Sequence, residues 1–350
     1  MINNRILSLA VLFSLHLLLP ASAGAYTLTP QTLTVNGHTI QLRVPNGLRV
    51  QYLAGMDAPR FLTLGPDQEL IVGSRGDALY RLKKPYRTPE TLVRLAGRNH
   101  SVAYRTGQLF VAESGGLHGA PYGGSATVLN AGDFSLVVAL PAQTGGHWSR
   151  TVVMGPDARL YIGIGISGNC SDEYLDASYL FERRRGGVFV VDETGALPRL
   201  RPFSAGLRNP IGLAFHPQTQ TLYATNAGPD NLGYDQPPEV FSALTQGSFH
   251  GMPWFQYYNG AFRSGECATS PAPRPASEAT PPSATFAARS TPEGIAFVTT
   301  SRLSGEFQGN ALVAIHGSWA VAPGAGQESR RPPKISMVRF SNGNPAGVQD

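Results

Sequence analysis

One short unit recurs five times along this chain, and it constrains the fold more than any other feature of the sequence. Each copy holds an apolar strand, a turn and a second strand that ends in small residues, and the copies begin near residues 59, 99, 147, 208 and 292. Repetition on this scale is typical of a β-propeller, in which each repeat builds one blade. A β-sandwich is the competing all-β architecture, but it accounts less well for repeated units. We therefore predict an all-β fold of the β-propeller type.

The composition agrees with short strands in one large domain. The 350 residues include 40 Gly and 28 Pro, too many for the long helices of a bundle. A Pro/Ala/Ser-rich stretch at 268–285 lies inside the widest interval between repeats, so we expect an inserted loop there and one propeller domain over residues 26–350. The net charge of +5 comes with one basic run, Arg183-Arg184-Arg185, which we interpret as a solvated loop. This pattern excludes a nucleic-acid-binding surface.

The first 25 residues have the pattern of a secretory signal peptide. Arg5 is followed by an apolar stretch at 6–19 and by small residues up to Ala25. No later stretch reaches the ~20 apolar residues that span a bilayer. We therefore expect a periplasmic or secreted protein without a membrane span. In an oxidising compartment Cys170 and Cys267 are able to form a disulfide, which we expect, and two free thiols are the alternative.

Motifs at the repeat starts are similar to those of one known family. No single motif is decisive, but their order and spacing together are specific. The motifs are Gly145-Gly146-His147-Trp148-Ser149-Arg150, Gly206-Leu207-Arg208-Asn209-Pro210, Ala224-Thr225-Asn226-Ala227-Gly228-Pro229, Gly251-Met252-Pro253 and His316-Gly317-Ser318-Trp319. In these motifs the chain resembles the glucose/sorbosone dehydrogenase family over nearly the whole mature sequence. The resemblance implies a six-bladed propeller that uses pyrroloquinoline quinone (PQQ) and Ca²⁺ to oxidise a sugar.

His147 is the predicted general base. Oxidation of a sugar at C1 requires removal of the hydroxyl proton while hydride leaves C1 for an electrophilic quinone carbon, and a neutral imidazole suits that step. The family's base matches His147. The resemblance also implies that Arg208 stabilises the negative charge that arrives on the quinone with the hydride. The alternatives are a structural histidine at a strand start and a structural arginine in a loop.

The resemblance implies further contacts to the cofactor and the metal ion. Arg208 and Asn209 are expected to contact PQQ, and Lys334 is expected to pair with a cofactor carboxylate unless it is only a solvated strand end. Gly228 and Pro229 match the positions whose backbone carbonyl groups ligate Ca²⁺ in the family.

We expect the substrate to be contacted by residues at the repeat starts, the same end of the blades at which His147 lies. His100 stands at the repeat start before that of His147, so we expect it to face the same channel and to contact the sugar. Trp148 and Trp319 are expected to line the mouth and to stack on sugar faces, with ordinary packing against the blades as the alternative.

Several positions depart from the family pattern. An Asp-Asn-Gly sequence of the family is Asn226-Ala227-Gly228 here, an acidic and an amide position are Val240 and Ser242, and an Asn-Arg pair is Ala320-Val321. The family's last repeat, which carries another cofactor-contacting arginine, is missing or incomplete in these 350 residues. We therefore expect a propeller of the six-bladed type without its last blade, and weak binding of PQQ.

The sequence thus predicts a periplasmic PQQ-dependent sugar dehydrogenase. It carries no Cys-x-x-Cys-His haem motif, so we expect electrons to pass to a separate acceptor. Two other classes stay open. A Ca²⁺-dependent propeller hydrolase, such as a lactonase, is kept open by Asp230, Asp235 and Glu239. A non-catalytic secreted propeller that binds a partner or a glycan is favoured by the missing repeat and the lost acidic positions.

Overall fold

The structure is a computed structural model that describes residues 26–350 except 143–144, 231, 266, 269 and 304. The predicted signal peptide lies outside the described residues. Within them, regular structure consists of 25 strands and four short 3₁₀ helices, which confirms the all-β prediction. No helix among the described residues is long and apolar enough to cross a membrane. The chain divides into two units, at residues 1–52 and 53–350.

The first unit contains a β-hairpin. Strands β1 (Leu28–Val35) and β2 (His38–Pro45) pair antiparallel in continuous register. The two residues between them, Asn36 and Gly37, have φ values of 48° and 79°. Two consecutive positive φ values are what a tight hairpin turn requires, and the Asn-Gly pair supplies them at low cost.

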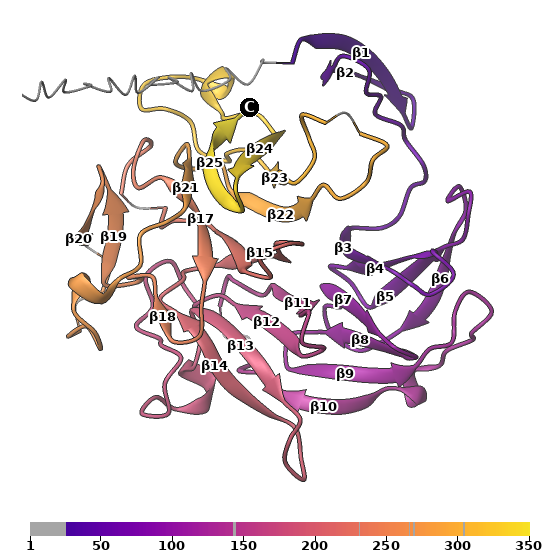
Figure 1. Cartoon of the computed structure of the whole chain (residues 1–350), viewed down its shortest axis with the longest axis horizontal. Helices are drawn as coiled ribbons and strands as arrows, with labels where there is room; N and C mark the ends of the chain where they lie inside the picture. The colour runs from indigo at the N-terminus through magenta and orange to yellow at the C-terminus, as the bar shows by residue number, and fades with distance from the viewer. Residues whose placement is uncertain (1–25, 143–144, 231, 266, 269, 304) are drawn as a thin grey trace, which may run out of the picture. The chain divides into compact units, whose positions relative to one another are not determined.

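The second unit is a series of five blades, each of four antiparallel strands, and a fifth, parallel strand extends the third blade (Figure 1). The first three are β3 (Pro59–Leu64), β4 (Leu70–Ser74), β5 (Ala78–Leu82), β6 (Pro89–Arg94); β7 (Ser101–Arg105), β8 (Gln108–Ala112), β9 (Gly116–Pro121), β10 (Ser135–Ala139); and β11 (Arg150–Met154), β12 (Leu160–Ile164), β13 (Gly187–Asp192), β14 (Arg199–Ala205). The last two are β15 (Pro210–Phe215), β16 (Leu222–Asn226), β17 (Glu239–Leu244), β21 (Ala284–Phe286); and β22 (Pro292–Phe297), β23 (Ala311–Ile315), β24 (Lys334–Ser341), β25 (Asn344–Gln349). The 3₁₀ helices are η1 (Ala131–Asp133), η2 (Phe181–Arg183), η3 (Ala276–Glu278) and η4 (Gln327–Ser329).

The first strand of each blade begins at or within three residues of a predicted repeat start. These innermost strands, β3, β7, β11, β15 and β22, pack against one another in chain order. Three of them begin with a proline, Pro59, Pro210 and Pro292, and a register shift follows each proline. Proline is tolerated at the first residue of an edge strand, where no ladder hydrogen bond is lost. The described residues thus hold five blades, and the count of six expected from the resemblance is not observed among them.

The hydrophobic core is divided into four clusters, each between two consecutive blades. Alternation along a strand sends neighbouring side chains to opposite faces. Phe189 therefore packs toward the second blade, whereas Val188 packs toward the fourth. In the same way, Leu222 packs toward the third blade and Tyr223 toward the fifth. Each blade is stabilised mainly by its neighbours.

The predicted loop at 268–285 lies between β20 and β21 and ends in the first residues of β21, and it is part of a longer insertion between β17 and β21. Before residue 268 this insertion carries β18 (Ser248–Phe249), which joins the third blade parallel to β14, and the hairpin of β19 (Phe255–Tyr258) and β20 (Ala261–Ser264). Cys267 in the insertion forms a disulfide with Cys170 in the loop after β12. The predicted disulfide is therefore confirmed, and it ties the insertion to the end of the third blade.

Candidate active site

Three predicted site residues meet around one glycine. His147 precedes β11, while Arg208 and Asn209 precede β15. A Cβ atom placed on Gly165 would lie 2.6 Å from Asn209 Oδ1, 2.9 Å from His147 Cβ and 3.1 Å from the Arg208 carbonyl oxygen. The backbone of Ile166 also donates a hydrogen bond to that carbonyl over 2.8 Å. Only a residue without a side chain leaves room for this arrangement.

The hydrogen bond of His147 fixes the form of its imidazole ring. Nδ1 lies 2.6 Å from the carbonyl oxygen of Ile166. Because a carbonyl oxygen only accepts, Nδ1 carries the proton and Nε2 carries the lone pair. Burial, with the positive charge of Arg208, lowers the pKa of His147 to about 4. The ring is therefore neutral at pH 7, as a general base requires.

Two buried arginines hold the backbone of His147. Arg150 and Arg185 each donate a hydrogen bond to the His147 carbonyl oxygen over 3.3 Å. Both side chains are 0% exposed, and burial lowers the pKa of each, to about 9 for Arg150. The interpretation of the basic run as a solvated loop is wrong for Arg185, because this guanidinium is needed to satisfy backbone carbonyl groups around His147. A triplet of arginines gives no signal that one of them points inward.

Arg208 is held in place from several directions. It is 4% exposed, and it donates hydrogen bonds to the carbonyl and side-chain oxygens of Asn169 over 2.9 and 2.6 Å. Its guanidinium also pairs with Asp230 over 3.0 Å. Burial lowers the pKa of Arg208. These contacts make Arg208 a fixed positive charge beside His147.

Asn209 carries a buried oxygen atom that lacks a partner. Its backbone N–H donates to Asn226 Oδ1 over 2.8 Å, but its own Oδ1 has no hydrogen-bond partner among the described residues. A buried polar atom left in this state costs free energy, and it calls for an explanation such as a functional role, a bound water or an ion. The protein thus leaves one buried acceptor atom beside His147 and Arg208.

The predicted Ca²⁺ ligands do not fit a metal ion in this structure. The Pro229 carbonyl oxygen accepts a hydrogen bond from the guanidinium of Arg289, which also donates to the carbonyl groups of Gly233 and Gln236. Arg289 lies 3.7 Å from Asp230 as well. A cation at the Pro229 carbonyl would meet the positive charge of this buried side chain. Arg289 stands three residues before Pro292, which begins β22, and Arg208 stands two residues before Pro210, which begins β15. This similar position is the signal that the sequence offers for Arg289.

The neighbouring Gly228 has a carboxylate partner. Its backbone N–H donates to Glu239 Oε2 over 2.5 Å. Burial raises the pKa of Glu239 to about 7, against the opposing effect of this hydrogen bond and of the charges of Arg208 and Arg289. Glu239, a metal ligand in the hydrolase alternative, instead holds the loop that carries Gly228.

The other carboxylates of the hydrolase alternative are also engaged. Asp235 pairs with Arg331 over 2.9 Å, and Asp230 pairs with Arg208. Across the described part of the chain, no group of three or more His, Cys, Asp or Glu side chains is arranged to hold a metal ion.

The predicted substrate residues form a separate group. His100 is 2% exposed, and its ring lies against Phe61 and Trp148, with centroids 5.0 and 5.3 Å apart. His100 therefore lacks the open face that direct contact with a sugar requires. Burial lowers its pKa to about 4, and its Nδ1 lies 3.2 Å from the Arg150 carbonyl oxygen. Trp148 is surrounded by guanidinium groups, and Trp319 is 64% exposed.

Lys334 is not brought to His147. It begins β24, the third strand of the last blade, and its ammonium group pairs with the side chain of Asp350. No contact joins Lys334 to His147, Arg208 or Asn209 within the described residues.

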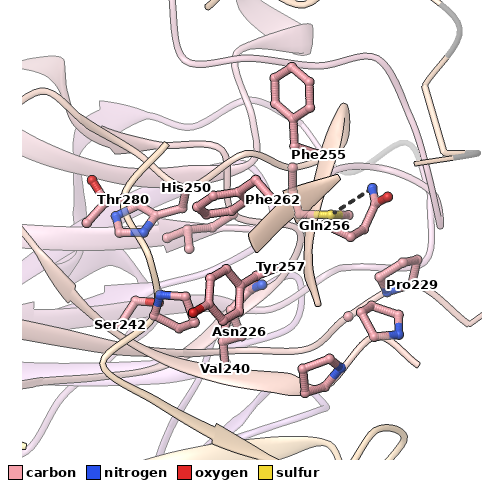
Figure 2. A pocket seen from close by; sticks show the side chains of 16 residues that line it. Asn226, Pro229, Val240, Ser242, His250, Phe255, Gln256, Tyr257, Phe262 and Thr280 are labelled. Atoms are coloured by element: carbon pink, nitrogen blue, oxygen red, sulfur yellow. Dashed lines mark hydrogen bonds between the residues drawn. The ribbon is translucent and has the colours of Figure 1, made fainter. Parts of the chain in front are cut away.

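A small pocket lies beside the site, under the insertion. Figure 2 shows Tyr257 and Phe262 of the insertion facing Asn226 and Val240 of the fourth blade. The cavity has a volume of about 30 Å³, which leaves room for one or two water molecules. The pocket is therefore too small for a sugar, and it separates the insertion from the loop at Pro229.

Comparison with known proteins identifies the family. The sequence profile of the glucose/sorbosone dehydrogenase family matches residues 128–320, more than half of the chain. The chain belongs to this family. The match includes His147, Arg208 and Asn209, so the residues that meet around Gly165 lie in the part shared with the glucose/sorbosone dehydrogenases.

Solved structures share the fold at low sequence identity. A calcium structure of a Trichoderma reesei enzyme of carbohydrate-active family AA12 has a TM-score of 0.67 and 19% identity, covering 83% of this chain and 80% of that one. The PQQ domain of pyranose dehydrogenase from Coprinopsis cinerea has a TM-score of 0.62 and 17% identity, with coverages of 83% and 78%. A PQQ-bound aldose sugar dehydrogenase from Streptomyces coelicolor has a TM-score of 0.58 and 18% identity, with coverages of 85% and 82%.

Proposed function

We propose that this protein is a sugar dehydrogenase that oxidises the C1 hydroxyl group of an aldose or sugar aldehyde, with PQQ as cofactor and His147 as general base. The observation that carries the proposal is the state of His147. Its Nδ1–H is used by the Ile166 carbonyl group, so Nε2 is the basic atom, and the pKa of about 4 keeps the ring neutral. Membership of the glucose/sorbosone dehydrogenase family supports the reaction class.

The residues around Gly165 fit an anionic quinone. Arg208 provides a fixed positive charge, and Asn209 provides a buried Oδ1 without a partner. When bound, PQQ supplies an electrophilic quinone carbon that accepts two electrons as hydride. Arg208 and Asn209 would hold the cofactor, and Arg208 would stabilise the added negative charge. His147 takes the hydroxyl proton at Nε2.

Calcium is not part of this proposal at the predicted position. The guanidinium of Arg289 donates a hydrogen bond to the Pro229 carbonyl oxygen. It supplies positive charge at that position without a metal ion. The electrons are proposed to leave for a separate acceptor.

Reconstitution tests the function. The purified protein is incubated with PQQ, and reduction of an artificial electron-accepting dye is followed with a panel of aldoses. We expect turnover with at least one aldose and a loss of about 10²–10⁴-fold in kcat for His147→Asn. Dye reduction that is absent with every aldose, or unchanged in His147→Asn, would overturn the proposal.

We also propose export to the periplasm with removal of residues 1–25. The Cys170–Cys267 disulfide supports this, because disulfides persist in oxidising compartments. Sequencing the N-terminus of protein from the native host should find a start near Tyr26, and an intact Met1 would contradict export by this route.

A further inference from the structure

Three arginines surround one tryptophan next to the candidate active site. The guanidinium carbons of Arg60, Arg75 and Arg98 lie 5.7, 5.9 and 5.2 Å from the centre of the Trp148 ring. We call Arg60, Arg75 and Arg98 the arginine cluster. Each guanidinium is attracted to the aromatic ring, but three positive charges around one ring also repel one another.

Backbone contacts between blades bring the arginine cluster together. Arg60 lies in β3, and the backbone of Arg75 donates to the Ala58 carbonyl oxygen over 3.0 Å, which holds Arg75 beside the start of β3. Phe61 next to Arg60 donates to the His100 carbonyl oxygen over 3.2 Å. The ring of His100 in turn packs against Trp148. The arginine cluster and Trp148 are therefore brought together by the ends of three successive blades and not by one loop.

Arg60 and Arg75 bring positive charge to the cluster that no ion pair offsets within the part of the chain that the structure describes. Within the described residues, no carboxylate lies within ion-pair distance of Arg60 or Arg75. Arg60 and Arg75 are both exposed to solvent. His100 adds no charge at pH 7, since burial lowers its pKa to about 4. Arg60 and Arg75 are therefore available to an external anion.

We propose that the arginine cluster binds the carboxylate of an acidic sugar, so that the preferred substrate is a carboxylated aldose such as a uronic acid. Arginine is suited to this because its planar guanidinium donates two parallel hydrogen bonds to a carboxylate. His147 and Trp148 are consecutive residues in the loop before β11, so the candidate base and the ring at the centre of the cluster belong to one loop. The proposal requires one monosaccharide to present C1 to His147 and its carboxylate to the cluster. The choice of sugar rests on the proposed function.

Direct binding to the cofactor-free protein tests the proposal. The probes are D-glucuronate and, as an uncharged sugar with the same ring, D-glucose, followed by calorimetry and by tryptophan fluorescence. We expect D-glucuronate to bind at least about tenfold more tightly, and added salt to weaken only D-glucuronate. Arg60→Gln/Arg75→Gln should weaken D-glucuronate binding about 100-fold and leave D-glucose unchanged. Equal binding of both sugars, or no effect of the double variant, would overturn the proposal.

Two controls separate the outcomes. Arg302→Gln removes an exposed arginine from the loop between β22 and β23, outside the cluster, and should change nothing. Arg60→Lys/Arg75→Lys keeps the charge and should retain part of the affinity, which shows that a loss in the Gln variant is not misfolding. PQQ is a further probe: if the Gln variant weakens PQQ binding while D-glucuronate does not bind, the cluster serves the cofactor and the acidic-sugar proposal fails. If D-glucuronate binds through the cluster but dye reduction is absent, the proposed function fails instead.

Discussion

His100 and His147 stand just before the innermost strands of two consecutive blades, and they differ in what surrounds them. In both, Nδ1 lies at hydrogen-bond distance from a backbone carbonyl oxygen, and burial lowers both pKa values to about 4. His100 is enclosed by the rings of Phe61 and Trp148. His147 lies beside Arg208 and Asn209 instead. The repeated fold thus offers the same place twice, and the neighbouring loops give the two histidines different surroundings.

The largest expected effect comes from replacing the two histidines in the same way. Asparagine keeps a side-chain N–H near the position of Nδ1 and removes Nε2. We expect His147→Asn to lower kcat of the PQQ-reconstituted protein by about 10²–10⁴-fold, because it deletes the proposed general base. His100→Asn should stay within about tenfold of wild type.

Dye reduction under saturating aldose measures both variants, with circular dichroism as the check on folding. Similar losses in the two variants would break the comparison, since they would show that His100 is as close to the chemistry as His147.

The packing around Gly165 gives the next effect in size. In Gly165→Ala the new Cβ would press on Asn209 Oδ1, His147 Cβ and the Arg208 backbone at 2.6–3.1 Å. We expect activity to fall by about 10–100-fold, because small displacements of catalytic groups are costly. The matched control is Gly146→Ala in the loop before β11, where a Cβ meets nothing within 4 Å. Equal activity of the two variants would show that the contact at Gly165 does not position the site.

Replacement of either histidine should have the same effect on the pH dependence of the unfolding free energy, although the effects on activity differ. Their folded pKa of about 4 lies below the unfolded value of 6.5, so the unfolded state binds more protons between pH 4 and 6.5. Stability is therefore fully present above pH 6.5 and is lost as the pH falls toward 4. Each Asn variant should reduce the slope of unfolding free energy against pH in this window by up to about 1.4 kcal/mol per pH unit. Urea unfolding at several pH values measures the slope, and an unchanged slope would show that the histidine titrates normally.

The sequence carried more information about the fold than about the site. Strand starts such as Pro59, Pro210 and Pro292 follow from local alternation and turn chemistry, which are readable along the chain. The contacts of Arg185 and Arg289 are not readable in this way, because each guanidinium satisfies carbonyl groups that lie in other loops. Resemblance to the family pointed to His147 and Arg208, whereas the enclosure of His100 depends on ring packing between blades.

The smallest expected effect is the change of Tm on addition of Ca²⁺. It concerns the loop of Pro229, whose backbone carbonyl groups are held by a buried arginine, as those of the His147 loop are. In both loops buried arginines donate to backbone carbonyl groups: Arg150 and Arg185 to His147, and Arg289 to Pro229. Because Arg289 already supplies the positive charge, we expect Ca²⁺ to leave Tm of the wild-type protein unchanged. Arg289→Met frees the carbonyl groups and leaves Asp230 nearby, so Ca²⁺ should raise Tm of this variant by a few degrees. Thermal unfolding with and without Ca²⁺ makes the measurement, and Arg302→Met is the control. A saturable rise of Tm in the wild type would show that the metal displaces Arg289, and the two loops would then differ in kind.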